Sequence, residues 1–145
     1  MSEHDRIFVD TNVWLYAFIA AQDGPKHLRA QQIIGREAVV VSVQVVNEVC
    51  RNLLRKAAYS EQRVRNLIAS YYSKCQVVAV DQGILARASD LRGRYGFSFW
   101  DSLLIATAVD QRIATFYSED MHHGLVVDGV TRIVNPFAIS PASPP

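Results

Sequence analysis

The fold of this chain is decided by residues 7–12, which read IFVDTN. An apolar run typical of a buried strand ends at Asp10, and apolar residues then recur at helical spacing from Trp14 onward. Thr11 or Asn12 is expected to cap that helix, because a short side-chain oxygen satisfies a backbone N–H left free there. Asp10 would then lie between strand and helix, at the edge of a parallel sheet where ligands bind.

Strands and helices alternate along the rest of the chain. Strands are predicted over residues 6–10, 38–41, 76–80, 113–117 and 131–134, and helices over residues 26–34, 42–59, 81–95 and 100–112, with another after Ser60. This alternation predicts an α/β fold whose parallel sheet is covered by helices on both faces. Because no internal repeat or interior linker is visible, residues 1–136 are expected to form one domain. The proline-rich residues 137–145 are expected to form a tail without fixed structure.

The composition excludes several classes of protein. With 145 residues, of which 50% are hydrophobic, the chain has enough apolar material for the core of a single domain. The net charge of +1 gives no overall basic character, so any surface that binds nucleic acid must be local. Cys50 and Cys75 lack the spacing of metal ligands and are expected to be reduced thiols. The absence of a signal-peptide pattern and of a bilayer-spanning apolar run favours a soluble cytoplasmic protein with no membrane partner.

Glu48 is a second candidate acid, near the start of the predicted helix that follows Ser42. It lies outside the apolar stripe of that helix and shares one face with Arg51, Asn52 and Arg55, at positions i, i+3, i+4 and i+7. An acid flanked by arginines fits an ordinary ion pair on a solvated face. The same arrangement fits a metal ligand beside cations that bind phosphate, so both interpretations stay open.

Asp101 is the most informative acid. Leu104, Ile105 and Ala108 fall around the same direction of the predicted helix, so Asp101 lies within an apolar stripe. Burying a carboxylate there is costly unless it is paired or bound to metal. The positive end of the helix would stabilise an acid in the first turn, but that explains its position and not the direction in which it faces. The pattern therefore favours a functional role.

Asp120 follows the strand predicted over residues 113–117, through Ser118 and Glu119. An exposed loop acid is the ordinary explanation for it, and Glu119 competes for the same role. Asp10 and Asp120 nevertheless share the carboxyl-terminal edge of the predicted sheet, and helices that follow parallel strands begin at that edge as well. The four acids are therefore expected to converge.

Four converging carboxylates need cations, because they otherwise repel one another and retain protons. A ligand set made only of oxygen selects hard ions, Mg²⁺ or Mn²⁺, of which one or two can activate water to cut a phosphodiester. Asn12 and Ser118 would orient ligands or water, and Arg51 and Arg55 would hold an RNA phosphate. No P-loop and no GxGxxG motif competes with this interpretation.

These motifs resemble those of PIN-domain ribonucleases, and most of all those of the VapC-type toxins of toxin–antitoxin pairs. The matching segments are residues 8–12 (FVDTN), 46–49 (VNEV), 99–108 (FWDSLLIATA) and 118–121 (SEDM), the last ahead of Gly124. The first and third motifs are fairly specific in combination, whereas the glutamate motif is loose. The resemblance extends over nearly the whole chain, to about Pro136.

The resemblance implies a three-layer α/β/α sandwich around a central parallel sheet of four to five strands, in the order 3-2-1-4-5. It implies an endoribonuclease dependent on Mg²⁺ or Mn²⁺, whose catalytic and metal-binding residues are Asp10, Glu48, Asp101 and Asp120. Thr11, Asn12 and Ser118 match positions that line the acidic pocket of the family. A homodimer and a cognate antitoxin protein that covers the site are implied as well.

Other functions remain open. A housekeeping RNA-processing nuclease and a non-catalytic RNA-binding scaffold would share the fold. A phosphatase of the haloacid dehalogenase type would use Asp10 as a covalent nucleophile, but that class usually has a second aspartate at the position of Asn12. A receiver domain requires a lysine late in the chain, and the last lysine here is Lys74.

Overall fold

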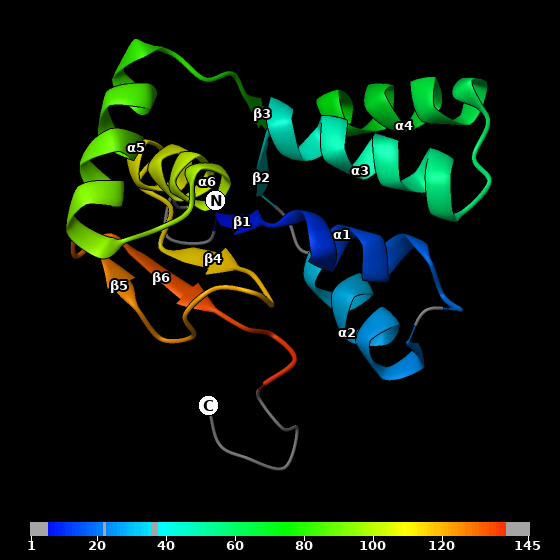
Figure 1. Cartoon of the computed structure of the whole chain (residues 1–145). Helices are drawn as coiled ribbons and strands as arrows, with labels where there is room; N and C mark the ends of the chain where they lie inside the picture. The colour runs from blue at the N-terminus through cyan, green and yellow to red at the C-terminus, as the bar shows by residue number, and fades with distance from the viewer. Residues whose placement is uncertain (1–5, 22, 36–37, 139–145) are drawn as a thin grey trace.

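The computed structural model describes residues 6–21, 23–35 and 38–138. Of the tail predicted over residues 137–145, the structure describes residues 137 and 138, and residues 139–145 lie outside the described part of the chain. The described residues form the following elements (Figure 1): β1 Ile7–Val9, α1 Thr11–Phe18, α2 Gly24–Ile34, β2 Val39–Ser42, α3 Val43–Lys56, α4 Glu61–Lys74, β3 Gln76–Val78, α5 Gln82–Tyr95, α6 Phe99–Asp110, β4 Thr115–Tyr117, β5 Val126–Val127 and β6 Thr131–Val134. The α/β class predicted from the sequence is confirmed.

The strands form one sheet in the order β3-β2-β1-β4-β6-β5. Every neighbouring pair is parallel except β5 and β6, which run antiparallel. The first five positions match the expected order 3-2-1-4-5, with β6 as the fifth predicted strand. The prediction of four to five parallel strands missed β5, which has two residues and turns back through Asp128 and Gly129, with φ of 52° and 67°. A strand this short shows no period in the sequence.

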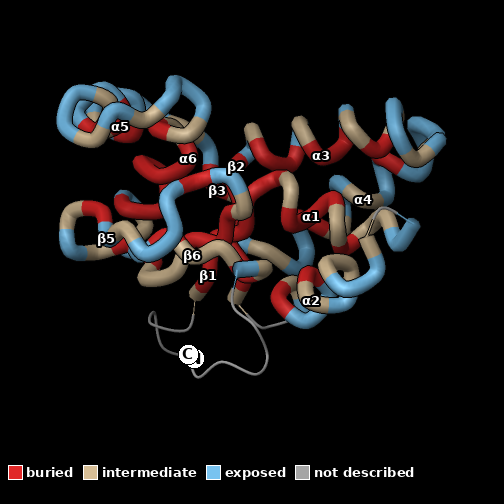
Figure 2. Tube along the Cα trace, turned by 60° about the horizontal axis from the view of Figure 1, so that its bottom comes forward, coloured by how far each residue is buried: buried red, intermediate tan, exposed pale blue. Residues whose placement is uncertain are grey.

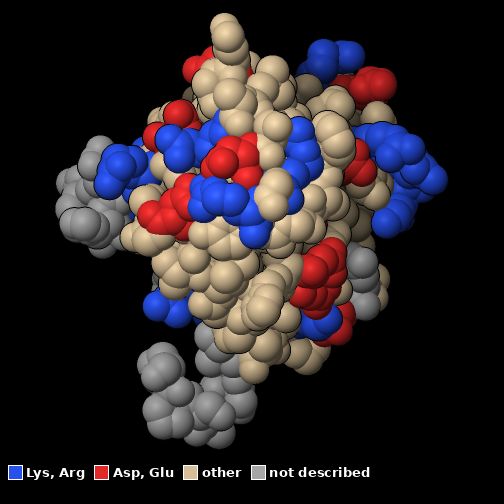
Figure 3. All heavy atoms as spheres, turned by 60° about the vertical axis from the view of Figure 1, so that its left-hand side comes forward, with Lys and Arg blue, Asp and Glu red and all other residues tan. Residues whose placement is uncertain are grey.

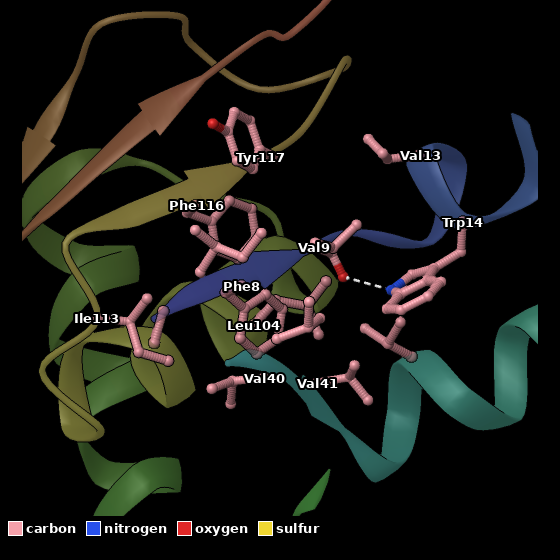
Figure 4. Packing of buried hydrophobic residues seen from close by; sticks show 14 of the residues in the cluster. Phe8, Val9, Val13, Trp14, Val40, Val41, Leu104, Ile113, Phe116 and Tyr117 are labelled. Carbon is pink, nitrogen blue, oxygen red and sulfur yellow. Dashed lines mark hydrogen bonds between the residues drawn. The ribbon is translucent and has the colours of Figure 1, made fainter. Parts of the chain in front are cut away.

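Strand β1 lies in the middle of the sheet and of the core. All three of its residues are buried, and the Phe8 ring stacks on Phe116 of β4 with 4.9 Å between the ring centroids (Figure 4). The indole N–H of Trp14 on α1 donates to the carbonyl of Val9 at 3.0 Å. This bond ties the first turn of α1 to the end of β1, so the position of Asp10 between them is held from both sides.

Each helix in the described residues begins with a short polar side chain that accepts a backbone N–H, as expected of good N-caps. These residues are Asp10, Asp23, Ser42, Ser60, Asp81 and Ser98. The predictions for Ser42, Ser60 and Asp81 are confirmed. The prediction for α1 was wrong, because Asp10 itself is the N-cap and takes the place assigned to Thr11 or Asn12. Its extended backbone, with φ −75° and ψ 162°, brings its carboxylate to the N–H of the next residue.

Helices lie on both sides of the sheet. Figure 1 shows the sheet between the α5–α6 pair and the α1–α2 pair, with the α3–α4 hairpin beside them. Burial is concentrated along β1 and the inward sides of the helices (Figure 2). Helix α6 is buried from Leu104 to Val109, whereas Phe99 and Trp100 in its first turn are exposed. The open end of α6 is therefore the end that carries Asp101.

The face over α5 carries charges of both signs. Arg94 pairs with Asp90 one turn earlier and with Asp128 in the β5–β6 turn, and Figure 3 shows acidic and basic side chains intermixed there. The pairing joins α5 to the edge of the sheet and balances much of the charge on this face. No helix within the described residues has the length and the apolar character needed to cross a membrane.

Candidate active site

The site lies at the point between β1 and β4 where the strand order of the sheet reverses. From β1 the chain crosses to β2 and β3 on one side, while β4 and β6 occupy the other side. The carboxyl ends of β1 and β4 are neighbours at this switch point, which is where open α/β sheets bind ligands. Asp10 follows β1 and Ser118 follows β4. The topology thus brings together two segments that are far apart in sequence.

Both oxygens of Asp10 have hydrogen-bond donors. Oδ1 accepts the backbone N–H of Thr11 at 2.7 Å, and Oδ2 accepts the hydroxyl of Ser118 at 2.9 Å. The Asp10 side chain is largely buried, and Ser118 is fully buried behind it. The carboxylate is therefore held in one orientation at the base of the site.

Burial raises the pKa of Asp10 to about 6, because a charged carboxylate loses its hydration there. The hydrogen bonds from Thr11 and Ser118 act in the opposite direction, and the negative charges of Asp101 and Asp120 add to the increase. Asp10 therefore titrates just below neutral pH. A cation bound beside Asp10 would favour the ionised carboxylate and lower its pKa again.

Asp101 and Asp120 reach the same place from different elements. Asp101 lies in the first turn of α6, where its backbone N–H is taken by the hydroxyl of the N-cap Ser98. Partial burial raises the pKa of the Asp101 carboxyl, a hydrogen bond between that side chain and Ser98 lowers it, and the charge of Asp120 raises it further. Asp120 accepts a hydrogen bond from the side-chain amide of Asn12 on α1, across 108 residues of sequence. The charge of Asp120 thus acts on both Asp10 and Asp101, as expected of acids that lie close together.

Glu48 approaches from α3 and is held by its own helix. The Asn52 amide donates to the Glu48 carboxylate at 3.0 Å and to its backbone carbonyl at 2.8 Å. Arg51 lies 3.5 Å from the same carboxylate and is largely exposed. Asn52 is thus the closer and better placed of the two partners.

The four predicted acids surround one cavity of about 390 Å³ at the switch point. Its lining residues are Asp10, Thr11, Asn12, Glu48, Asn52, Trp100, Asp101 and Asp120. Thr11 contributes a buried hydroxyl that has no hydrogen-bond partner among the described residues. The expected convergence of acids from β1, α3, α6 and the segment after β4 is therefore what the folded chain contains.

The choice between Glu119 and Asp120 is decided by tertiary contacts. Glu119 accepts the hydroxyl of Tyr16 at 2.9 Å and forms an ion pair with Lys26 on α2. These contacts engage both of its carboxylate oxygens outside the acidic cavity. Asp120 contacts Asn12 and lines the cavity, so it is the acid of this segment that faces the other three.

The predicted phosphate-binding arginines are placed less favourably. Arg51 and Arg55 are exposed on α3, and neither lines the acidic cavity. Ser118 touches Asp10 from behind, so it acts on the orientation of Asp10 and does not face a ligand directly. Their proposed roles toward RNA and ligand remain predictions.

Two lining residues were not predicted as part of the site. Asn52 was noted only as a neighbour of Glu48, although its position one helical turn later places an amide within reach of the acid. Trp100 was treated only as part of the motif around Asp101. An aromatic residue next to a candidate acid in the first turn of a helix was the signal that could have found it.

The donor set fits hard cations, with one qualification from the geometry. Within the part of the chain that the structure describes, no three histidine, cysteine, aspartate or glutamate side chains form a group able to hold an ion on their own. The acids surround the cavity at wider spacing. Mg²⁺ keeps several of its waters in proteins and is commonly bound through one or two carboxylates, so a cavity of this size lined by carboxylate oxygens suits a hydrated ion.

The fold and the site define a PIN domain. The family model described as PIN domain matches residues 7–124, and the chain belongs to this family. The match begins at β1 and includes all four acids of the cavity.

Solved structures with this fold include proteins of toxin–antitoxin systems. A toxin–antitoxin complex from Klebsiella pneumoniae is 21% identical, with a TM-score of 0.67 over 90% of this chain and 97% of that chain. VapC20 of Mycobacterium tuberculosis, described as a toxin that cleaves the sarcin–ricin loop, is 22% identical, with a TM-score of 0.62 over 76% and 86%. FitAcB from Neisseria gonorrhoeae is 16% identical, with a TM-score of 0.61 over 92% and 99%. At these identities the likeness establishes the fold alone. No curated protein matches the sequence significantly.

Proposed function

We propose that this protein is a metal-dependent endoribonuclease and the toxin of a toxin–antitoxin pair. The observation that carries the proposal is the single cavity at the switch point, where Asp10, Glu48, Asp101 and Asp120 meet in a PIN-family chain. Four carboxylates from four distant segments have no structural need to share a cavity, and their repulsion destabilises the fold. Such a cost is typical of a catalytic site.

A bound Mg²⁺ or Mn²⁺ would supply the charge that polarises the phosphodiester and activates water. The chain itself performs the positioning. Thr11 and Ser118 hold the two oxygens of Asp10, Asn12 holds Asp120, and Asn52 holds Glu48. Because these three acids already have hydrogen-bond partners, little reorganisation of their side chains is needed when a cation and a phosphate enter.

The toxin assignment rests on fold likeness. The solved structure from Klebsiella pneumoniae is a toxin–antitoxin complex, and VapC20 is described as a toxin that cleaves the sarcin–ricin loop. By analogy, this chain would act on RNA, form a homodimer and be covered by a cognate antitoxin protein. Arg51 and Arg55 on the exposed face of α3 would then contact RNA phosphates beyond the cavity.

The test is cleavage of structured RNA by the purified protein with Mg²⁺, with Mn²⁺ and with EDTA. Asp101→Asn is compared with Asp110→Asn, the same change at the exposed far end of α6. We expect discrete products with metal from the parent and from Asp110→Asn, and none in EDTA or from Asp101→Asn. Cleavage that persists in EDTA overturns the metal mechanism. RNA binding without cleavage in either metal supports the scaffold instead.

A further inference from the structure

Two aromatic residues that are adjacent in sequence are exposed at the start of α6, and the second of them, Trp100, lines the acidic cavity. Phe99 is 78% exposed and Trp100 is 41% exposed, and together they form the first turn of α6 beside Asp101. Most other large apolar residues of α6 are fully buried. Leaving two large rings in water forgoes the burial that stabilises the rest of the helix, so their placement calls for an explanation outside folding.

The Phe99 ring is held in place. The guanidinium of Arg92 on α5 lies 3.9 Å from the ring centroid, within the range of a cation–π contact. Arg92 also donates to the hydroxyl of the buried Ser102 at 2.9 Å, and that hydroxyl donates to the carbonyl of Phe99 at 2.8 Å. The contacts fix the ring and place a positive charge against one of its faces. The exposed ring is therefore a preorganised surface.

Trp100 connects this surface to the site. Its side chain lines the acidic cavity together with Asp101, on the same helical turn as Phe99. If a phosphate of an RNA strand is bound at the acids, the nucleotides next to that phosphate lie beside the indole ring of Trp100. In single-stranded RNA these groups are unstacked bases, which proteins bind on aromatic and guanidinium planes.

We infer that Phe99, with Arg92 against its ring, and Trp100, which lines the cavity, bind an unpaired nucleobase of RNA next to the phosphate that is cut. The inference rests on the proposed function and deepens it, because it places specificity for unpaired RNA on the first turn of α6. A nucleotide is favoured over a peptide as the occupant. A metal ion held by the acids would bind a phosphate, the exposed aromatic rings would bind a flat ring, and a nucleotide carries both groups.

The decisive experiment measures binding of a fluorescently labelled single-stranded oligoadenylate by anisotropy, in Mg²⁺. Every variant is made in the Asp10→Asn chain, so that RNA is not consumed. Trp100→Leu and Phe99→Leu keep apolar bulk and remove the ring, whereas Trp100→Phe keeps a ring. We expect the two leucine variants to bind about tenfold more weakly or worse, the usual effect of losing one stacked base. Trp100→Phe should retain most of the affinity.

Two controls separate stacking from general damage. Tyr72→Leu removes another exposed aromatic, 57% exposed on α4 and away from the acidic cavity, and should leave binding unchanged. An oligonucleotide of abasic sites should bind the parent and Trp100→Leu equally weakly. Fluorescence gives a direct readout, because the second tryptophan, Trp14, is buried. Quenching by oligoadenylate should be present with Trp100 and absent in Trp100→Phe.

The outcomes distinguish this inference from the proposed function. If the chain with native Asp10 cleaves RNA and the leucine variants bind as tightly as the parent, the aromatic pair does not bind a base, although the nuclease stands. If the parent neither binds nor cleaves RNA in either metal, both the nuclease and the base-binding surface are wrong. In active enzyme, Trp100→Leu should raise KM more than it lowers kcat, and a fall in kcat alone would contradict base binding.

Discussion

Lys26 on α2 forms an ion pair with Glu119, the residue immediately before the site acid Asp120. The same ammonium group lies 5.0 Å from the ring centroid of Tyr16, whose hydroxyl also donates to Glu119. The contact joins α1 and α2 to the segment after β4. We interpret it as a clamp that directs Asp120 toward the cavity by holding its neighbour away from it.

Replacing Lys26 by Met should release this clamp. The metal would then bind more weakly, by about 10- to 100-fold, because positioning residues around a metal site have effects of this size. The measurement is the Mn²⁺ concentration that gives half-maximal activity, followed with the melting temperature of the metal-free protein. Lys26→Arg should restore the metal affinity. A change in stability with no change in metal affinity would show that the clamp is structural only.

Ser118→Ala should move the acid limb of the pH–activity profile to higher pH. The Ser118 hydroxyl donates to Asp10 and lowers the pKa of that carboxyl, so its removal raises the pKa. A larger fraction of Asp10 is then protonated near neutral pH and unable to bind a cation. Ser118→Thr keeps the hydroxyl and should keep the profile. An unshifted profile in the alanine variant would mean that Asp10 ionisation does not control activity.

Asp10→Asn should abolish cleavage and yet stabilise the metal-free protein at neutral pH. The pKa of Asp10 is about 6 in the folded chain against 3.8 for an ordinary aspartate. The folded state therefore binds this proton more tightly, and stability is greatest below the lower value and falls as pH rises through about 6. This difference between the two pKa values lowers the free energy of unfolding of the parent by about 3 kcal/mol at pH 7.

The measurement for this prediction is chemical denaturation in EDTA at several pH values. The gap between Asp10→Asn and the parent should be small at pH 4 and widen toward pH 7. A gap of the same size at every pH would show that Asp10 is not strained in the ionised form. Added Mn²⁺ should narrow the gap, since it stabilises only a protein that binds it.

Asn52→Ala should lower kcat/KM more than Arg51→Ala. Asn52 donates to the Glu48 carboxylate at 3.0 Å from within the cavity, whereas Arg51 lies 3.5 Å away and is largely exposed. An exposed pair of that kind contributes about 0–1 kcal/mol. We expect a loss of about tenfold or more for Asn52→Ala and little change in the intrinsic hydrolysis of a short RNA for Arg51→Ala. Equal losses would show that the arginine is part of the site.

Phe116→Ala should destabilise the chain by about 3–5 kcal/mol, the usual cost of removing a buried phenylalanine. Phe116 is fully buried and stacks on Phe8 at the centre of the sheet. Its loss weakens the contact between β1 and β4, which forms the base of the site. The midpoint of urea unfolding gives the measurement. Tyr95→Ala, on the partly exposed end of α5, should cost much less.

The local pattern of the sequence determined the elements of the fold. Periods of two and 3.6 residues, short polar caps and turn residues act over a few positions, so the alternation of strands and helices and the caps Ser42, Ser60 and Asp81 were predictable. That the four acids would meet in one cavity was predictable as well, because each follows a strand or lies in the first two turns of a helix near one edge of a parallel sheet.

The tertiary structure alone decided how those acids are held. Asn12 meets Asp120 across 108 residues and Lys26 meets Glu119 across 93, and no local period connects positions that far apart. Such contacts require the pairing of β1 with β4, which brings the segments that follow these two strands together. The choice of Asp120 over Glu119 depends on these distant contacts. Local propensity specifies what each segment forms, whereas packing of distant segments specifies which side chains share the cavity.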